Sequence, residues 1–334
     1  MRICIFGAGA VGGMLGNELG RVGHAVTLIA RGPHLDAIRK NGLTVFMDGD
    51  RRHTTPFATD DPAEADRQDT VIFVVKAHSL ADAAKQANPL LGPDTTIVAA
   101  QNGIPWWYGY GASDPLRDVT LTAVDPGAQI WQSLGPERVV GGVINGSCAL
   151  LEPGVIEHQQ PSRSLTIGEP LGNSTKRCEG LMAAFAETDI DVPVADDIRH
   201  AIWAKLLNNI GANMICVLTR APLGNANGDP RCFAFMARIM QETAKVAARI
   251  GIDLTQAVAQ RLKGGPVSTT HKPSTLQDLE AGRPMEIDAI VGAVLEIARR
   301  VGEPTPVIDN LYALLRRLAE ESRTYPENPA FTLE

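Results

Sequence analysis

The chain has 334 residues, 44% of them hydrophobic and 21% charged, and a formal net charge of −7 at pH 7. These proportions belong to an ordinary globular protein of about two domains, and they exclude disordered, collagen-like and coiled-coil chains. Because the acidic balance provides no summed positive field, we expect no nucleic-acid or membrane partner, and an anionic substrate must be met by a few local cations.

The cysteines and the hydropathy pattern restrict the compartment. Five cysteines without a CxxC pair fit neither a disulfide framework nor a zinc cluster, so we expect a reducing compartment and no metal site. No apolar run approaches the roughly 18 residues that span a bilayer. Residues 1–11 are apolar but broken by glycines, which is unlike a signal peptide. We therefore expect a cytoplasmic protein.

The first half of the chain alternates short β-branched runs with helical stretches, the pattern of βα units around a parallel sheet. The predicted strands are residues 3–6, 25–30, 71–75 and 97–100. Glycine and proline punctuate residues 119–169, which suggests antiparallel strands at a sheet edge. A last strand-like segment covers residues 190–194.

The pattern becomes helical after this segment. The predicted helices are residues 198–218, 233–250, 254–262, 285–301 and 307–322. We therefore expect an α/β Rossmann-type domain over residues 1–194 and an all-α domain over residues 195–334.

A glycine-rich motif follows the first predicted strand. Its residues are Gly7, Ala8, Gly9, Ala10, Val11 and Gly12. Placed between a strand and a helix at the start of a βαβ unit, this is the dinucleotide-binding fingerprint. Gly7 permits the tight turn, Gly9 lets the backbone approach a pyrophosphate, and Gly12 allows close helix packing. A glycine turn without a ligand is the structural alternative.

The end of the second predicted strand indicates which dinucleotide binds. NAD-binding chains carry an acid there for the ribose hydroxyls, whereas this chain has Ala30, Arg31 and Gly32. The guanidinium of Arg31 suits a 2′-phosphate, which favours NADP(H) over NAD. The alternative is an arginine that is merely solvated at a strand end.

Two further strand ends carry polar residues where ligands bind in such sheets. Lys76 can pair with a phosphate or a substrate carboxylate, and Asn102 can hydrogen-bond a ribose, a nicotinamide amide or the substrate. A solvated lysine and an Asn-Gly turn are the structural alternatives.

The helix predicted over residues 198–218 is apolar on most sides, so its polar residues need an explanation. Lys205, Asn209 and Asn213 are spaced i, i+4 and i+8, on one stripe. A lysine in such surroundings has a lowered pKa and can donate a proton, while two amides can hold a carboxylate and a hydroxyl. The alternative is a lysine that reaches solvent beside asparagines that pack between helices.

Glu286 stands at the start of another apolar helix, where it can orient Lys205. The alternative is a carboxylate that the helix dipole favours at a helix N-terminus.

Together, the motifs resemble the ketopantoate reductase (2-dehydropantoate 2-reductase) family. They are the glycine motif at residues 7–12, Lys76, Gln101-Asn102-Gly103, WAKLLNN at 203–209, PSTLQD at 273–278, EID at 286–288 and PTP at 304–306.

This resemblance implies a Rossmann-type domain followed by a helical domain similar to the C-terminal domain of 6-phosphogluconate dehydrogenase. It implies NADPH-dependent reduction of a 2-keto acid, with Lys205 as proton donor and Glu286 as the acid that positions cofactor and lysine. Further residues are matched to the family's cofactor and substrate contacts: Lys76, Asn102, Cys148, Asn209, Asn213 and Ser274. The only macromolecular partner allowed for is a second copy of the chain.

The sequence also departs from the family pattern. Leu223 replaces an expected asparagine, and Ser79 replaces an expected polar residue that is often glutamine. Residues 106–110 contain Trp106, Trp107, Tyr108 and Tyr110, where the family usually has a short glycine-rich turn. This aromatic segment either lines a larger pocket or is an aromatic plug between domains.

The leading hypothesis is reduction of ketopantoate to pantoate in pantothenate and coenzyme A biosynthesis. A related reductase of another branched or bulkier 2-keto acid is the first alternative. A non-catalytic NADP-binding sensor is the second, although such a protein would not need both Lys205 and Glu286.

Overall fold

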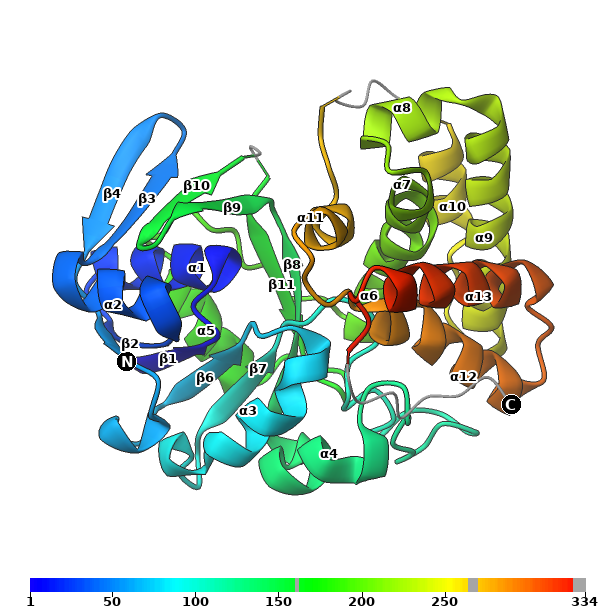
Figure 1. The fold of residues 1–334 in the computed structure, drawn as a ribbon. Coiled ribbons are helices and arrows are strands. Elements are labelled where there is room, and N and C mark those ends of the chain that lie inside the picture. Colours follow the sequence, from blue (N-terminus) through cyan, green and yellow to red (C-terminus); the bar gives the residue numbers. More distant parts are fainter. Residues whose placement is uncertain (160–161, 264–269, 327–334) are drawn as a thin grey trace. The chain divides into compact units, whose positions relative to one another are not determined.

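The computed structural model describes residues 1–159, 162–263 and 270–326. They form two compact units: unit 1 comprises the described residues within Met1–Gln101 and Gln129–Ile198, and unit 2 those within Asn102–Ala128 and Arg199–Glu334. Unit 1 is an α/β Rossmann-type domain, and the described residues of unit 2 form helices and connecting loops without a strand (Figure 1). The predicted fold class is therefore confirmed.

The predicted division after residue 194 lies close to the passage into unit 2 at Arg199. The structure differs from it in one segment, because residues 102–128 pack with unit 2. Two contacts explain this placement: the amide of Ile104 donates to the carbonyl of Ala289 at 2.9 Å, and the side chain of Trp203 donates to Tyr108.

Unit 1 contains a seven-stranded sheet with the order β11-β8-β7-β6-β1-β2-β5. Its strands are β1 (Arg2–Phe6), β2 (Ala25–Ile29), β5 (Phe57–Thr59), β6 (Thr70–Phe73), β7 (Thr96–Ala99), β8 (Val139–Asn145) and β11 (Ser164–Gly168). All neighbours are parallel except β11, which runs antiparallel to β8 at the edge. The central strands are almost wholly buried, as expected where helices cover both faces.

A second, four-stranded sheet has the order β4-β3-β10-β9. Its strands are β3 (Leu43–Met47), β4 (Asp50–Thr54), β9 (Cys148–Glu152) and β10 (Val155–His158). The helices of unit 1 are α1 (Ala10–Arg21), α2 (Gly32–Asn41), α3 (Leu80–Gln86), α4 (Gln129–Leu134) and α5 (Lys176–Phe185). Helix α1 contacts β1 and β2 of the large sheet and all four strands of the small one, so it lies between the two sheets (Figure 1).

The small sheet corrects two parts of the sequence analysis. The strands β3 and β4 were not predicted, although Asp48 and Gly49, both with positive φ, form the two-residue turn that is typical of a hairpin. Residues 119–169 do contain an antiparallel edge strand, β11, but β9 and β10 join the small sheet and residues 119–128 belong to unit 2. Pairing partners far apart in the chain decided this, which local patterning does not reveal.

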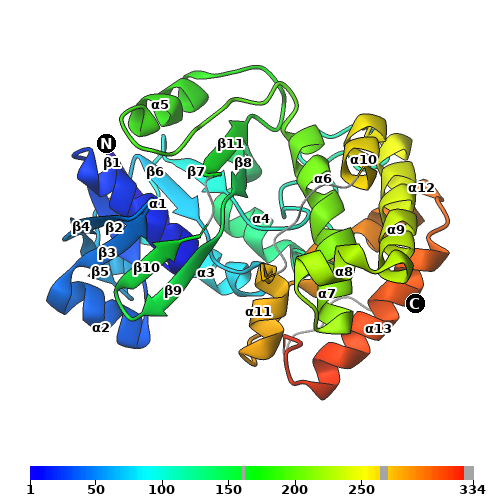
Figure 2. The ribbon, with the colours of Figure 1, turned by 90° about the horizontal axis from the view of Figure 1, so that it is seen from above.

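Unit 2 contains every helix predicted from the second half of the chain. Its helices are α6 (Ile198–Asn208), α7 (Met214–Thr219), α8 (Leu223–Gly228), α9 (Pro230–Arg249), α10 (Thr255–Leu262), α11 (Ser274–Glu280), α12 (Ala293–Val301) and α13 (Pro306–Glu321). Two π-helical stretches, Asn209–Asn213 and Asp288–Gly292, precede α7 and α12. The long helix α9 contacts α8, α10, α12 and α13, and Figure 2 shows it among them.

The continuous helix Ile198–Thr219 is long and apolar enough to cross a membrane by length and composition alone, contrary to the expectation that no such run exists. However, 67% of its apolar window is buried inside the protein. This burial is that of a core helix, which is apolar because it packs on several sides.

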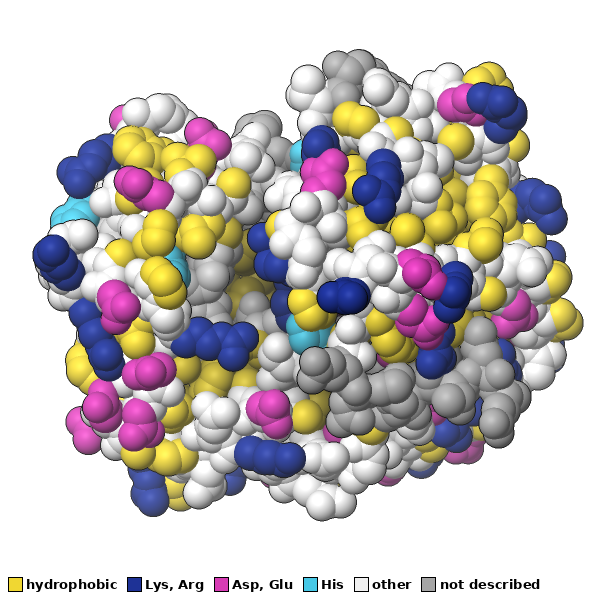
Figure 3. Space-filling model, in the orientation of Figure 1, with side chains coloured by type: hydrophobic (Ala, Val, Ile, Leu, Met, Phe, Trp, Pro, Cys, Tyr) yellow, Lys and Arg dark blue, Asp and Glu magenta, His cyan; other side chains and the backbone are white. Residues whose placement is uncertain are grey.

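Charged side chains of both signs are interspersed on the face shown in Figure 3. Inside unit 1, by contrast, Glu18 of α1 is fully buried and accepts hydrogen bonds from Arg21, Arg52 and the amide of Asp189. Burial would raise the pKa of Glu18, but these hydrogen bonds outweigh it and lower the pKa. The carboxylate therefore links α1 to the small sheet and to the segment after α5.

We predict that Glu18→Ala lowers the free energy of unfolding by about 3 kcal/mol, because it leaves the Arg52 guanidinium without its buried partner. Glu64→Ala, which removes a half-exposed partner of Arg39, is the control and should cost under about 1 kcal/mol. Denaturant unfolding at neutral pH measures both. Because the pKa of Glu18 is lowered by folding, its stabilising contribution should be lost as the pH falls below about 4. Equal costs for the two variants at neutral pH would contradict the assignment.

Candidate functional site

The glycine-rich turn lies at the carboxyl end of β1, between β2 and β6. The chain continues from β1 to β2 on one side, and β6 to β8 extend on the other, so the sheet order reverses at this point. Crevices at such reversals are where open α/β sheets bind ligands. Gly7 has φ +102°, and a Cβ there would lie 2.6 Å from the side chain of Val75. Only glycine fits this turn.

The remaining motif glycines differ in what surrounds them. A Cβ at Gly12 would lie 2.3 Å from the carbonyl oxygen of Gly7, so α1 packs directly against the turn. A Cβ at Gly9 would meet no atom within 4 Å, and Gly9 is the exposed N-cap of α1. The backbone is thus approachable at Gly9, and the amides of Ala10 and Val11 begin the helix beside it. This geometry fits a dinucleotide diphosphate, which a helix N-terminus favours.

Arg31 lies just beyond the carboxyl end of β2, exposed, as the extended residue before α2. The residues around it are Ala30 and Gly32, so no carboxylate neighbours the guanidinium in sequence. The position fits recognition of a cofactor phosphate, as the sequence predicts.

Two other predicted cofactor residues also belong to unit 1. Lys76 follows β6 and starts a short 3₁₀ turn, with its side chain partly buried. Cys148 begins β9, opposite His158 of β10, and packs with Ala10 and Val11 against the core of unit 1. Burial raises the pKa of the Cys148 thiol to about 12, so the thiol stays protonated at neutral pH.

In unit 2, three predicted site residues from separate segments meet. Lys205 of α6 donates a hydrogen bond from Nζ to Oδ1 of Asn102 at 2.9 Å. The Nδ2 of Asn102 in turn donates to Oε2 of Glu286 at 3.4 Å. The amide therefore connects the lysine and the carboxylate, and Glu286 is almost completely buried. The sequence predicted each of these residues but not that Asn102 lies between the other two.

The electrostatics of this trio suit proton transfer. Removal from water lowers the pKa of Lys205 to about 8, and the negative charge of Glu286 opposes part of that shift. An amine with such a pKa is substantially protonated at neutral pH and still gives up its proton readily. The arrangement can therefore protonate an oxygen placed against Nζ.

The predicted polar stripe continues along the same helix. Nδ2 of Asn213 donates to Oδ1 of Asn209 at 3.1 Å, and Asn209 is buried. Both lie in the π-helical stretch between α6 and α7, a feature that often marks functional sites. Ser274 is the exposed first residue of α11, a helix that contacts this stretch and α7. Hydrogen bonds thus join the two asparagines to each other and Lys205 to Asn102.

The Asn-Gly turn that the sequence offers as an alternative at this position holds Asn102 in place. The next residue, Gly103, has φ +84°, and a Cβ there would lie 2.2 Å from the carbonyl oxygen of Ala289. The same carbonyl accepts the amide of Ile104. The Asn-Gly dipeptide is the signal for this turn, since glycine permits both the positive φ and the close approach.

Glu286 is held by hydrogen bonds to residues on both sides of it. The amide of Met285 donates to the carbonyl of Thr324, and Asp288 accepts from the hydroxyls of Tyr312 and Tyr325 at 2.7 Å. Desolvation raises the pKa of Asp288. Sequence periodicity gave no signal for these contacts, because they join segments more than 20 residues apart.

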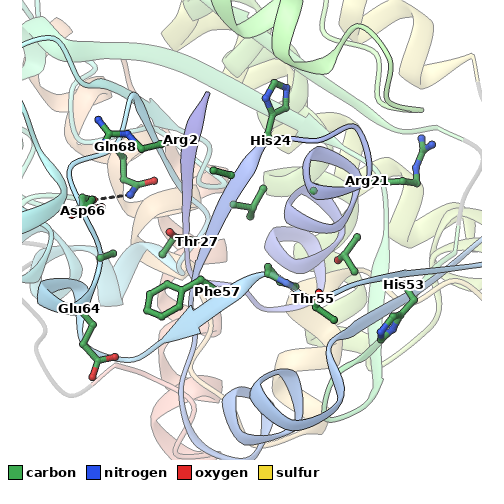
Figure 4. Close-up of a pocket in the computed structure, with 16 residues that line it drawn as sticks. Arg2, Arg21, His24, Thr27, His53, Thr55, Phe57, Glu64, Asp66 and Gln68 are labelled. Carbon is green, nitrogen blue, oxygen red and sulfur yellow. Dashed lines mark hydrogen bonds between the residues drawn. The ribbon is translucent and has the colours of Figure 1, made fainter.

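A separate groove of about 830 Å³ opens at the other end of the large sheet (Figure 4). Its lining includes Arg2, Ala25, Phe57 and Gln68, which are the first residues of β1, β2 and β5 and a residue of the segment before β6. Since ligands of such sheets bind at the carboxyl ends of the strands, this groove is distinct from the glycine-rich turn. Within the described ranges, no group of three His, Cys, Asp or Glu side chains is placed to hold a metal.

Comparisons with known proteins agree with this architecture. The family model described as Ketopantoate reductase PanE/ApbA matches residues 3–172, and the one described as Ketopantoate reductase PanE/ApbA C terminal matches residues 197–319. The chain is 43% identical to a 2-dehydropantoate 2-reductase of Mesorhizobium japonicum, over 97% of this chain and 100% of that protein.

Solved structures give the same result. A candidate ketopantoate reductase of Ralstonia solanacearum MolK2 is 39% identical, with a TM-score of 0.89 over 97% of this chain and 99% of that one. The 2-dehydropantoate 2-reductase of Geobacter metallireducens GS-15 is 28% identical, with a TM-score of 0.83 over 95% and 99% of the two chains.

The Rossmann-type unit, the helical unit with its buried lysine and these relatives define an NAD(P)-dependent oxidoreductase that acts on CH–OH groups. The chain belongs to the ketopantoate reductase family.

The motif glycines allow a matched test of dinucleotide binding. Gly9→Ala should leave the thermal unfolding midpoint near that of the parent and weaken dinucleotide binding about 10-fold or more, because the methyl group enters the open space beside the helix start. Gly12→Ala should instead destabilise unit 1 by about 1 to 3 kcal/mol, since its Cβ meets backbone. Nucleotide titration and thermal unfolding measure the two effects. Equal destabilisation by both substitutions would argue against the open cradle at Gly9.

Proposed function

We propose that this chain reduces 2-dehydropantoate (ketopantoate) to pantoate with NADPH, in pantothenate and coenzyme A biosynthesis. The observation that carries the proposal is the hydrogen-bonded arrangement of Lys205, Asn102 and Glu286, with its lowered lysine pKa. The relatives named 2-dehydropantoate 2-reductase support the choice of substrate.

The proposed roles in unit 1 concern the cofactor. Residues 7–12 hold the diphosphate at the start of α1, and Arg31 pairs with the 2′-phosphate of NADP(H). Lys76 and Cys148 contribute further contacts to the bound cofactor. We accordingly propose residues 1–194 as the NADP-binding domain and residues 195–334, with Asn102, as the substrate and catalytic part.

Bound NADPH supplies a hydride to the carbonyl carbon of the keto acid. Lys205 donates the proton that the carbonyl oxygen gains as the C=O bond becomes C–OH. Glu286 favours the protonated lysine before the reaction, and Asn102 orients its Nζ. Asn209, Asn213 and Ser274 are the proposed contacts of the substrate carboxylate and hydroxyl.

A panel of 2-keto acids tests the substrate. NADPH oxidation with ketopantoate should have the highest kcat/KM. A much higher value for a bulkier acid would instead favour the related-reductase alternative, and NADPH binding without turnover on any acid would favour the sensor. A homodimer and a cytoplasmic location also remain predictions, to be measured by sedimentation and by cell fractionation.

The role of Lys205 gives a pH prediction. Reduction needs the protonated amine, so kcat should fall as the pH rises through about 8. Glu286→Gln removes the charge that raises the pKa of Lys205, so the inflection should move to lower pH. Lys205→Ala should lower kcat about 100-fold or more, since a general acid is lost. Turnover by Lys205→Ala within a few fold of the parent would sink the assignment.

Arg31 gives the prediction for cofactor preference. Arg31→Ala should reduce kcat/KM for NADPH about 10-fold or more, since one charge-assisted hydrogen-bond partner of the phosphate is removed. The value for NADH should change little, because NADH lacks that phosphate. Arg39→Ala is the control, because Arg39 lies on α2, the helix that Arg31 precedes, but donates its hydrogen bonds to Ala58 and Thr59. An unchanged NADPH to NADH ratio in Arg31→Ala would overturn the proposed recognition of NADP.

A further inference from the structure

The aromatic segment at residues 106–110 is packed inside the protein rather than exposed. Trp106, Trp107 and Tyr108 are at most 2% exposed. The segment belongs to unit 2, and two side chains of helix α6 in that unit contact it. The two interpretations drawn from the sequence, a pocket lining and a plug, both stay predictions.

Two residues of α6, Trp203 and Arg199, contact the aromatic segment. The indole Nε1 of Trp203 donates to the Tyr108 hydroxyl at 2.7 Å, and the two rings meet edge to face. The guanidinium of Arg199 lies over the rings of Trp107 and Tyr108, 5.7 and 5.5 Å from their centroids. It also donates to the carbonyl oxygens of Tyr108 and Tyr110. Buried polar groups that are paired in this way specify one arrangement, because breaking a pair leaves a desolvated donor.

These contacts lie close in the chain to Lys205 and to the two residues that meet it, Asn102 and Glu286. Trp203 precedes Lys205 by two residues on α6. At the other end of the segment, Gly103 and Ile104 dock on Ala289, three residues after Glu286. Asn102 thus begins a short stretch that is fixed to the Glu286 region at residues 103–104 and to α6 at Tyr108.

We propose that Tyr108 is a positioning residue for the proton donor, acting through the 102–108 stretch to keep Oδ1 of Asn102 on Nζ of Lys205. The inference rests on the proposed function for its catalytic consequence. The physical link is the hydrogen bond that Asn102 accepts from the ammonium. A hydrogen bond from the Lys205 ammonium to the Asn102 oxygen favours the charged form of the lysine. If Asn102 moves away from Nζ, the pKa of Lys205 therefore falls.

The test is Tyr108→Phe, which keeps the ring and removes the hydroxyl that accepts from Trp203. The Lys205 titration is followed by NMR of lysine labelled at Cε, and the pH dependence of kcat is measured in parallel. We expect both inflections to move to lower pH by about half a unit or more, kcat at pH 8 to fall about twofold or more, and KM for NADPH to stay unchanged. Asn102→Ala should produce the same shift, and combining the two should add little.

Two further variants keep the test decisive. Thr243→Val is the control, because it removes a fully buried hydroxyl of α9 in the same unit whose hydrogen bond, among the described residues, goes to Ile239 of its own helix. Arg199→Gln removes the guanidinium that contacts the segment and should shift the Lys205 titration to lower pH as well. This second variant tests the proposal if Tyr108→Phe does not fold.

The outcomes separate the positioning role from the proposed function. The positioning role would be overturned by an unchanged titration: both Tyr108→Phe and Arg199→Gln fold, and Lys205 titrates in them at the same pH as in the parent and in Thr243→Val. If the titration shifts while Lys205→Ala retains normal turnover, the positioning role stands and the proton-donor function fails.

Discussion

An ammonium group in apolar surroundings is the constraint on which the arrangement of unit 2 depends. Lys205 lies on a helix that is mostly buried, so its charge is costly unless other groups compensate for the lost water. Asn102 and Glu286 provide this compensation from segments far away in the chain. Because the compensation is partial, the amine keeps a pKa of about 8, which is useful for proton transfer near neutral pH.

Close backbone contacts through glycine shape the proposed cofactor residues of unit 1 and, separately, the proposed catalytic residues of unit 2. In unit 1, Gly7 lets β1 turn directly against the end of β6, and the turn leaves the backbone at Gly9 open. In unit 2, Gly103 lets the chain touch the carbonyl of Ala289, and this contact presents Asn102 to Lys205. At each place a Cβ would separate two backbone segments that are in contact. Glycine is therefore required for the positions of the proposed binding and catalytic residues.

Much of the fold follows from local patterns in the sequence. The four buried parallel strands and the long helices were predicted because unbroken β-branched runs and 3.6-residue periodicity are properties of a segment by itself. The strand β4 was missed because its sequence, DRRHT, is polar on both faces, and only the Asp48-Gly49 turn signals its hairpin. The placement of residues 102–128 with unit 2 depends on contacts with α6 and Ala289, which no local window contains.

By itself, the sequence determined the glycine turn, the basic residue that replaces an acid after β2, and the stripe of Lys205, Asn209 and Asn213, since spacing and residue type define all three. Its charge of −7 already required any anion to be met locally. Only the tertiary structure decided that Asn102 lies between Lys205 and Glu286 and that the aromatic segment packs on α6. Hydrogen bonds and desolvation act between groups that are close in space, and folding sets those distances.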